Sequence, residues 1–299
     1  MVTLVLKTAE VPLQYLPCLF NCPKPKSFGT HFQKMKTLAR YLKKRKTAID
    51  FLLRKPSQKY TPNTFHKLRV EIKKLNSFLD LIHFGSSHFR RKKTYKPYKL
   101  IFSLAGKVRE LQIEEALLKN NFGNNGIKNY RKSLKKLRLK AEKDFFLLVD
   151  KKVKNQLIKK YYEIIPHLKS IDQKKMDTYL AKKENQIQEL LGQEIIRTGQ
   201  IHKLRKQLKI LNYNQAIVYP EISEEKLSGQ EVLPELLGKW HDCQVIIKHL
   251  KKMLTIGKLG PTELAEIKTI KPKIVLESKG LLNEIRNTLR VPRFFGGPN

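Results

Sequence analysis

A twelve-residue segment that occurs twice constrains the fold of this chain more than any other feature. The first copy begins at His66 and reads HKLRVEIKKLNS, and the second begins at His202 and reads HKLRKQLKILNY. At about 100° per residue, His66, Arg69 and Lys73 fall on one side of a helix, and leucine and isoleucine residues fall on the other. Each copy therefore predicts a helix with one apolar stripe and one stripe of anion-binding groups.

A second motif is repeated in the same order. Residues 104–113 read LAGKVRELQI, and residues 236–245 read LLGKWHDCQV. The displacement is 132 residues for this motif (104 to 236) and 136 for the first motif (66 to 202). Two motif pairs at nearly the same displacement indicate an internal duplication. A glycine inside a helix costs about 1 kcal/mol relative to alanine, so Gly106 and Gly238 at matching positions predict that two helices approach closely there.

The remaining pattern is helical almost throughout. Apolar residues recur at threes and fours, and no alternating run of the strand type is convincing. Residues 1–28 contain four prolines and are expected to be a poorly ordered leader. The chain is predicted to be all-α, with helices over residues 31–53, 62–84, 100–118, 128–163, 174–191, 198–213, 230–254 and 262–290, the last interrupted by Pro272.

The charge balance restricts the partners. The 299 residues contain 62 Lys and Arg against 26 Asp and Glu, a formal net charge of +36. This much like charge repels itself in a compact fold, so we expect a polyanionic partner or a membrane surface. No segment approaches the roughly 18 apolar residues of a membrane span, and residues 1–20 lack a secretory signal pattern. A cytoplasmic protein is expected.

Nothing in the sequence predicts catalysis. Cys18, Cys22 and Cys243 do not form a disulfide framework or a zinc-ligand pattern. Glu110 and Asp242 stand without the carboxylate cluster that a metal ion needs, and no nucleophile–base pair is apparent. We therefore expect no enzyme activity, no metal and no cofactor.

The two motifs together resemble those of the CHAD domain, the conserved histidine α-helical domain. The resemblance rests on His-x-x-Arg followed by basic residues, then Leu-Gly-x-x-Arg-(Asp/Glu), with both motifs repeated over roughly residues 30–290. It implies two four-helix bundles related by a pseudo-two-fold axis, here residues 29–163 and 164–295. It also implies non-enzymatic binding of inorganic polyphosphate in a basic groove or channel between the halves, and association with polyphosphate granules. CHAD domains often accompany a triphosphate-tunnel domain that starts Glu-x-Glu-x-Lys. No such segment is present, so a stand-alone copy is expected.

The resemblance implies a set of binding residues. At three positions where members of the family often carry arginine, this chain has Asn76, Asn212 and His241. At several other positions it has lysine in place of arginine. Lysine contacts phosphate as a point charge rather than as a bidentate fork, so affinity or chain-length preference is expected to differ from the family's usual. The predicted polyphosphate-binding residues are His66, Arg69, Lys73, Lys74, Lys107, Arg109, His202, Arg205, Lys206, Lys209, Lys239 and His241.

Three alternatives stay open at this point. A sequence-nonspecific nucleic-acid binder fits the composition equally well, although no aromatic stacking platform is interleaved with the basic residues. The lysines of the stripes could be an ordinary solvated face. Arg69 and Arg205 could instead pair in the core with Glu110 and Asp242. If both stripes bind one ligand, they should face each other across one shared groove.

Overall fold

A computed structural model describes residues 31–122, 127–191, 193, 197–219, 232–256 and 259–290. These residues contain no strand, and the prediction of an all-α chain is confirmed. Within them, no helix is long and apolar enough to cross a membrane. The predicted leader lies outside the described residues. The elements are α1 (His31–Arg54), η3 (Ser57–Lys59), α2 (Pro62–Gly85), α3 (Arg91–Phe122), α4 (Lys128–Leu148), α5 (Lys151–Ile164), η4 (Ile165–Ser170), α6 (Gln173–Leu191), α7 (Thr198–Val218), α9 (Val232–Ile256) and α10 (Pro261–Arg290).

The first copy of the repeated segment lies on α2, and its start follows from local chemistry. The Thr61 hydroxyl accepts a hydrogen bond from the backbone N–H of Thr64, and the Thr64 hydroxyl accepts one from the backbone N–H of Thr61. This reciprocal cap satisfies N–H groups that have no partner inside the helix. Pro62 occupies the first helical position, where no N–H is needed. The predicted apolar stripe of α2 is buried.

The prediction of one helix over residues 128–163 is wrong. The chain leaves the helical conformation after Leu148 and starts α5 at Lys151. Asp150 caps the new helix, because its carboxylate accepts a hydrogen bond of 2.8 Å from the backbone N–H of Val153. Aspartate is among the preferred residues at the N-cap of a helix. Asp150 therefore indicated the start of a new helix, although the helical spacing of the apolar residues suggested one continuous helix.

Other predicted boundaries move because tertiary packing overrides local breakers. α3 starts before Pro97, and α10 runs through Pro272 without a break. Buried Ile267 and Ile274 flank Pro272 and keep both parts of α10 in the core. α3 likewise extends to Phe122, into the predicted loop 120–126. α7 continues past Tyr213 to Val218, into the predicted loop 214–228, because Ile217 and Val218 are also buried.

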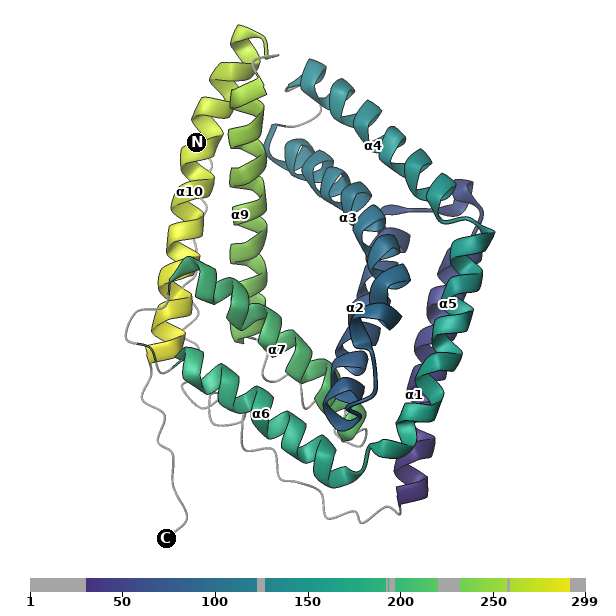
Figure 1. Cartoon of the computed structure of the whole chain (residues 1–299). Helices are drawn as coiled ribbons and strands as arrows, with labels where there is room; N and C mark the ends of the chain where they lie inside the picture. Colours follow the sequence, from purple (N-terminus) through teal and green to yellow (C-terminus); the bar gives the residue numbers. More distant parts are fainter. Residues whose placement is uncertain are drawn as a thin grey trace.

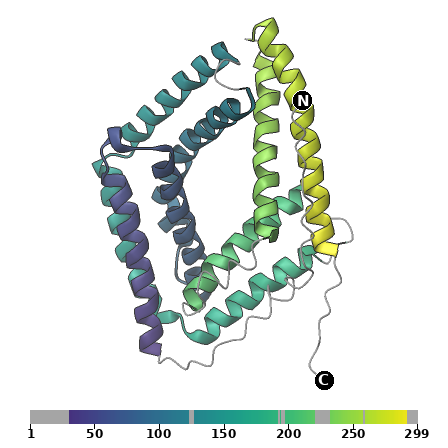
Figure 2. The ribbon, with the colours of Figure 1, turned by 180° about the vertical axis from the view of Figure 1, so that it is seen from behind.

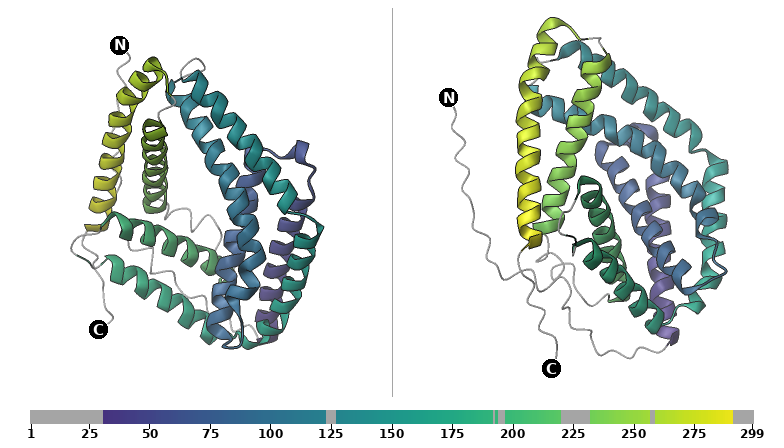
Figure 3. Two further views of the ribbon diagram at one scale, coloured as in Figure 1. Left: turned by 45° about the horizontal axis from the view of Figure 1, so that its top comes forward. Right: turned by 60° about the vertical axis from the view of Figure 1, so that its left-hand side comes forward.

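The helices are arranged largely in adjacent pairs around the molecule. α9 and α10 run side by side along one edge, and α1 and α5 lie along the opposite edge (Figures 1 and 2). α3 packs against both α2 and α4, and α6 packs against α7 (Figure 3). α2 also contacts α6 and α7 and so joins the two parts of the chain. The motif copies therefore lie on α2 and α7, and on α3 and α9.

The apolar interior has a large and a small part. The large core takes residues from every helix between α1 and α7, from the start of α9 and from Ile285 of α10. The small core joins the end of α3 and the start of α4 to α9 and α10, through residues such as Leu118, Leu134 and Leu250. The large core runs through both predicted halves and so does not mark a boundary between them. The division of the chain into two bundles between residues 163 and 164 therefore stays a prediction.

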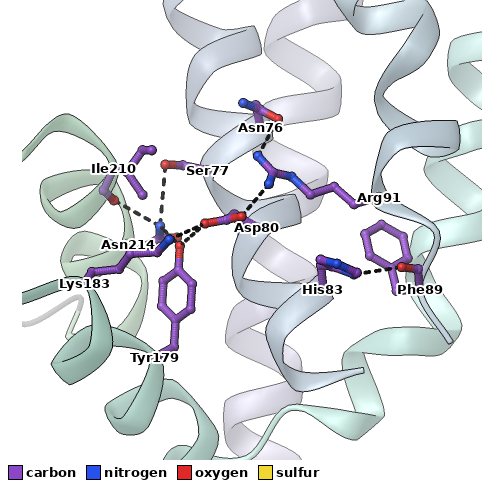
Figure 4. Close-up of polar contacts among 10 residues, drawn as sticks. All are labelled: Asn76, Ser77, Asp80, His83, Phe89, Arg91, Tyr179, Lys183, Ile210 and Asn214. Atoms are coloured by element: carbon purple, nitrogen blue, oxygen red, sulfur yellow. Dashed lines mark hydrogen bonds and ion pairs between the residues drawn. The ribbon is translucent and has the colours of Figure 1, made fainter. Parts of the chain in front are cut away.

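A polar network centred on Asp80 joins α2 to α3, α6 and α7 (Figure 4). The Asp80 carboxylate accepts bonds from Arg91 at 2.5 Å and from Tyr179 at 2.8 Å, and it pairs with Lys183 at 2.9 Å. The Tyr179 hydroxyl accepts a bond of 3.1 Å from the Asn214 amide of α7. The network therefore holds α2 and α7, the two helices that carry the first motif, in a defined relation to each other.

Candidate functional site

The cationic stripes of α2 and α7 meet in one cluster. Burial and the nearby charges of Lys209, Arg69 and Arg205 lower the pKa of Lys73 to about 8. Burial also lowers the pKa of Lys209, with Arg205 as the nearby cation. Lys73 on α2 and Lys209 on α7 are thus electrostatic neighbours. The structure brings the two predicted rows together, as expected if both serve one ligand.

α3 and α9 complete this cluster. His66 lies in the field of Arg109 from α3 and Lys209 from α7, and its pKa is lowered by desolvation and by these cations. Burial, together with Arg205, His202, Lys209 and Lys73, lowers the pKa of His241 to about 4. We call these residues the central basic cluster: His66, Arg69, Lys73, Arg109, His202, Arg205, Lys209 and His241.

Arg69 is held firmly in the first part of the cluster. Its Nη1 donates a hydrogen bond of 2.7 Å to the carbonyl oxygen of Phe102, and the guanidinium carbon lies 4.1 Å from the centre of the Phe102 ring. A methyl group at Gly106 would collide with Nη1 of the same guanidinium. Phe102 and Gly106 lie one turn apart on α3, so α3 supplies both a contact and a space for Arg69.

The corresponding arginine of the second copy, Arg205, is not held in this way. Within the described residues it makes no hydrogen bond or ion pair, and its buried Nε has no acceptor. The residue aligned with Phe102 is Pro234, which has no aromatic ring. Among the described residues, a methyl group added at Gly238 would meet no neighbouring atom within 4 Å.

Both glycines were expected to mark close helix–helix approach, and the structure corrects this. The neighbour of Gly106 is the end of the Arg69 side chain, not the backbone of another helix. A methyl group at Gly238 would meet no atom of another described element within 4 Å. The glycine of the motif therefore makes room for a side chain in one copy only.

Aromatic and imidazole rings replace the rigid arginine contact in the second copy. The His202 ring lies 4.8 Å from the Trp240 ring and 5.4 Å from the His241 ring, the latter edge-to-face. The buried Nδ1 of His241 has no hydrogen-bond partner among the described residues. The first copy has Val108 and Arg109 in place of Trp240 and His241. The two copies therefore present different chemistry to the same cluster.

The alternative left open above, in which Arg69 and Arg205 form core ion pairs with Glu110 and Asp242, is not realised among the described residues. Among the described residues, no ion pair involves Arg69, Arg109, Arg205, Lys73 or Lys209. Glu110 and Asp242 act on Arg69 and Arg205 only through their field. The cluster therefore keeps an excess of positive charge, which the fields of Glu110 and Asp242 offset only in part. The described part of the chain also contains no group of three or more His, Cys, Asp or Glu residues that could hold a metal ion.

Four predicted residues have other placements. Lys107 and Lys239 are exposed and lie two positions from Arg109 and His241, which places them about 200° around their helices. Lys239 pairs with Glu235 at 2.7 Å on the open face of α9. Lys206 is exposed but acts on His202, and Lys74 is partly buried beside Lys73. The structure thus separates Lys107 and Lys239 from the central basic cluster.

Phe102 is the contact that the sequence did not reveal. Two cations of α2 approach its ring: the Arg69 guanidinium carbon lies 4.1 Å from the ring centre and the Lys73 ammonium 5.9 Å. Cations are attracted to the face of an aromatic ring at such distances. In the sequence, the one indication of this contact was that Phe102 precedes Gly106 by one helical turn. A comparison of the two copies did not single out Phe102, because the aligned residue of the second copy is Pro234.

Two solved structures have the same fold. The crystal structure of the CHAD domain from the plant Ricinus communis matches with a TM-score of 0.67 and 13% identity, over 87% of this chain and 92% of that one. PptA from Streptomyces chartreusis matches with a TM-score of 0.66 and 10% identity, over 85% of this chain and 98% of that one. No curated protein sequence matches this chain. At these identities the two structures establish the fold alone.

The family is established by the sequence. The family model of the CHAD domain matches residues 37–251, which include both copies of the His-Arg motif and both copies of the glycine motif. The matched region also contains every member of the central basic cluster. This chain therefore belongs to the CHAD domain family.

Proposed function

We propose that the central basic cluster binds inorganic polyphosphate and that the protein does so without catalysing a reaction. The observation that carries this proposal is a set of cations on the contacting helices α2, α3 and α7 that lie in one another's electrostatic field without ion-pair partners among the described residues. Mutual repulsion of this kind destabilises the folded chain. A bound polyanion relieves it and gains several charge-assisted contacts at once.

The chemistry of the cluster suits a linear phosphate polymer. Such a polymer carries about one negative charge per phosphate and presents only oxygen acceptors. The cluster offers guanidinium and ammonium donors from two parts of the chain, and imidazoles whose charge can increase on binding. Membership of the CHAD family, whose members bind polyphosphate, supports the same ligand.

Nucleic acid is the second candidate. Aromatic rings in or beside the cluster include Phe102, Trp240 and the cluster member His202, and the partly buried Tyr95 and Tyr213 act on Arg69 and Arg205. Trp240 is 1% exposed, Phe102 is partly covered by Arg69, and His202 packs against Trp240. Single-strand binders stack bases on accessible aromatic faces, so these rings favour a ligand without bases.

A competition experiment separates the candidates. Labelled long-chain polyphosphate is bound to the full chain at fixed salt, and unlabelled polyphosphate, single-stranded DNA and duplex DNA are added at equal phosphate concentration. Polyphosphate should compete best, and Lys73→Ala and Lys209→Ala should each weaken its binding. Lys159→Ala, which removes the same charge from the exposed outer face of α5, is the matched control. Preferential displacement by single-stranded DNA would support the nucleic-acid alternative instead.

The proposed ligand also bears on localisation. Association with polyphosphate granules in the cytoplasm follows if polyphosphate is the ligand in the cell. Fluorescence microscopy of the tagged chain tests this, because the Lys73→Ala, Lys209→Ala double variant should lose any colocalisation with polyphosphate while the Lys159→Ala variant keeps it.

A further inference from the structure

We infer that Phe102 and Gly106 are positioning residues that fix Arg69 before the ligand arrives, so that α2 and α3 form the anchoring part of the central basic cluster. The inference rests on the proposed function and adds to it that the arginines of the two motif copies contribute unequally to binding. In the second copy Arg205 is the equivalent residue, and it is left without such support.

The geometry of Arg69 is set by α3 in three ways. These are the 2.7 Å hydrogen bond to the Phe102 carbonyl, the 4.1 Å stacking distance to the Phe102 ring, and the position of Nη1 in the space beside Gly106. A guanidinium has five N–H donors in a rigid fork. One donor is used by Phe102, so the others keep a defined direction when a phosphate arrives.

Fixing Arg69 in advance has an energetic consequence for binding. Ordering a long side chain on binding costs conformational freedom and so weakens binding. Arg69 has already lost that freedom in the folded chain, whereas Arg205 has no hydrogen bond or ion pair in the described residues to restrict it. The same phosphate contact should therefore contribute more to affinity from Arg69 than from Arg205.

Gly106 provides the space that Arg69 occupies. With alanine at residue 106, the added methyl group and Nη1 of Arg69 cannot occupy the same space. The end of a flexible side chain moves more easily than a helix backbone, so Arg69 should leave its place while the fold persists. Alanine at residue 238 meets no neighbouring atom within 4 Å in the part of the chain that the structure describes. Glycine-to-alanine substitutions at these two aligned positions thus form a matched pair. The one at residue 106 should weaken binding, and the one at residue 238 should not.

The experiment compares Gly106→Ala with Gly238→Ala by titration with polyphosphate of one defined length at several salt concentrations. Gly106→Ala should weaken binding by about 3–10-fold and flatten the slope of log affinity against log salt by roughly 0.7, the value for one lost contact by analogy with single-stranded nucleic acid. Gly238→Ala should leave both quantities unchanged. A purely structural role of Gly106 would lower the melting temperature but would not change the salt slope.

A double-mutant cycle tests whether Gly106 acts through Arg69. Added to Arg69→Ala, the Gly106→Ala substitution should have no further effect on affinity, because the group that it displaces is already absent. Independent, additive effects of the two substitutions would overturn the inference.

A second pair of variants keeps the test valid if Gly106→Ala fails to fold. Arg69→Lys and Arg205→Lys retain the charge and lose the planar fork. Arg69→Lys should weaken binding more than Arg205→Lys, and equal losses would contradict an anchoring role for α2 and α3. If the unmodified chain does not bind polyphosphate, the proposed function fails. If it binds and the Gly106→Ala variant binds equally well, only this inference fails.

Discussion

At the scale of single residues, the three histidines of the central basic cluster should make the proposed binding of polyphosphate dependent on pH. Desolvation by burial, and then the neighbouring cations, lower the pKa of His66, His202 and His241, the last to about 4. In the ligand-free chain these side chains are therefore neutral at pH 7. A bound polyanion stabilises the protonated form and raises each pKa, so the complex takes up protons and affinity should rise as the pH falls from 7.5 to 5.5.

Calorimetric titration in two buffers of different ionisation enthalpy measures this proton uptake directly. His241→Gln should reduce the uptake and flatten the pH dependence, whereas His88→Gln, an exposed histidine between α2 and α3, should change neither. An affinity that is constant between pH 5.5 and 7.5 would show that the imidazoles do not contact the ligand.

The carboxylates of the glycine motif carry a prediction of their own. Glu110 and Asp242 are exposed, and the described residues place no metal-binding group around them. Incubation of the purified chain with polyphosphate and magnesium or manganese should release no orthophosphate. Release that disappears in Glu110→Gln or Asp242→Asn variants would refute the proposal that the protein only binds.

At the scale of helices, Asp80 should be the main polar determinant of how α2 sits against α6 and α7. Burial alone would raise the pKa of Asp80, but the bonds and charges of Lys183, Arg91 and Tyr179 lower it. Asp80→Asn would leave two largely buried cations without their partner, at a cost of about 3–5 kcal/mol. Because the pKa of Asp80 is lowered on folding, its stabilisation should be complete near neutral pH and be lost as the pH falls below about 4.

Urea unfolding of Asp80→Asn at pH 7 and at pH 3 checks this prediction. The difference from the unmodified chain should be large at pH 7 and smaller at pH 3, because the stabilisation is lost as the pH falls through the lowered pKa of Asp80. Glu235→Gln is the control, since its pair with Lys239 is about 60% exposed on both sides and should contribute little. Equal stability of the Asp80→Asn variant and the unmodified chain at pH 7 would show that the network does not hold α2 in place.

At the scale of the whole molecule, the sequence predicted more of the architecture than of its details. The helical period and the cap at Thr61 gave the all-α class and the start of α2 correctly. The break at Asp150 and the continuity through Pro97 and Pro272 were missed, because a buried face or a single cap overrides the local signal. Such effects depend on which helices become neighbours, and a single sequence does not show this.

The sequence likewise predicted which helices form the central basic cluster but not the contacts within it. The repeated motif placed His66, Arg69 and Lys73 on one face and their partners on another, and the structure brings the two faces together. It did not predict that Phe102 would hold Arg69 or that Arg205 would be unsupported. Those contacts arise between α2 and α3 and between α7 and α9, at residues where the two copies differ.

The central claim is that cations from both parts of the chain hold one polyanion, and the salt dependence of polyphosphate affinity tests it most directly. Each contact between a cation and a phosphate releases counterions, so the slope of log affinity against log salt counts the contacts. We predict that Lys73→Ala and Lys209→Ala each reduce the slope by roughly 0.7, and that the double variant reduces it by about twice as much. Lys159→Ala should leave the slope unchanged. A slope that responds to substitutions on only one of α2 and α7, or to neither, would contradict the claim.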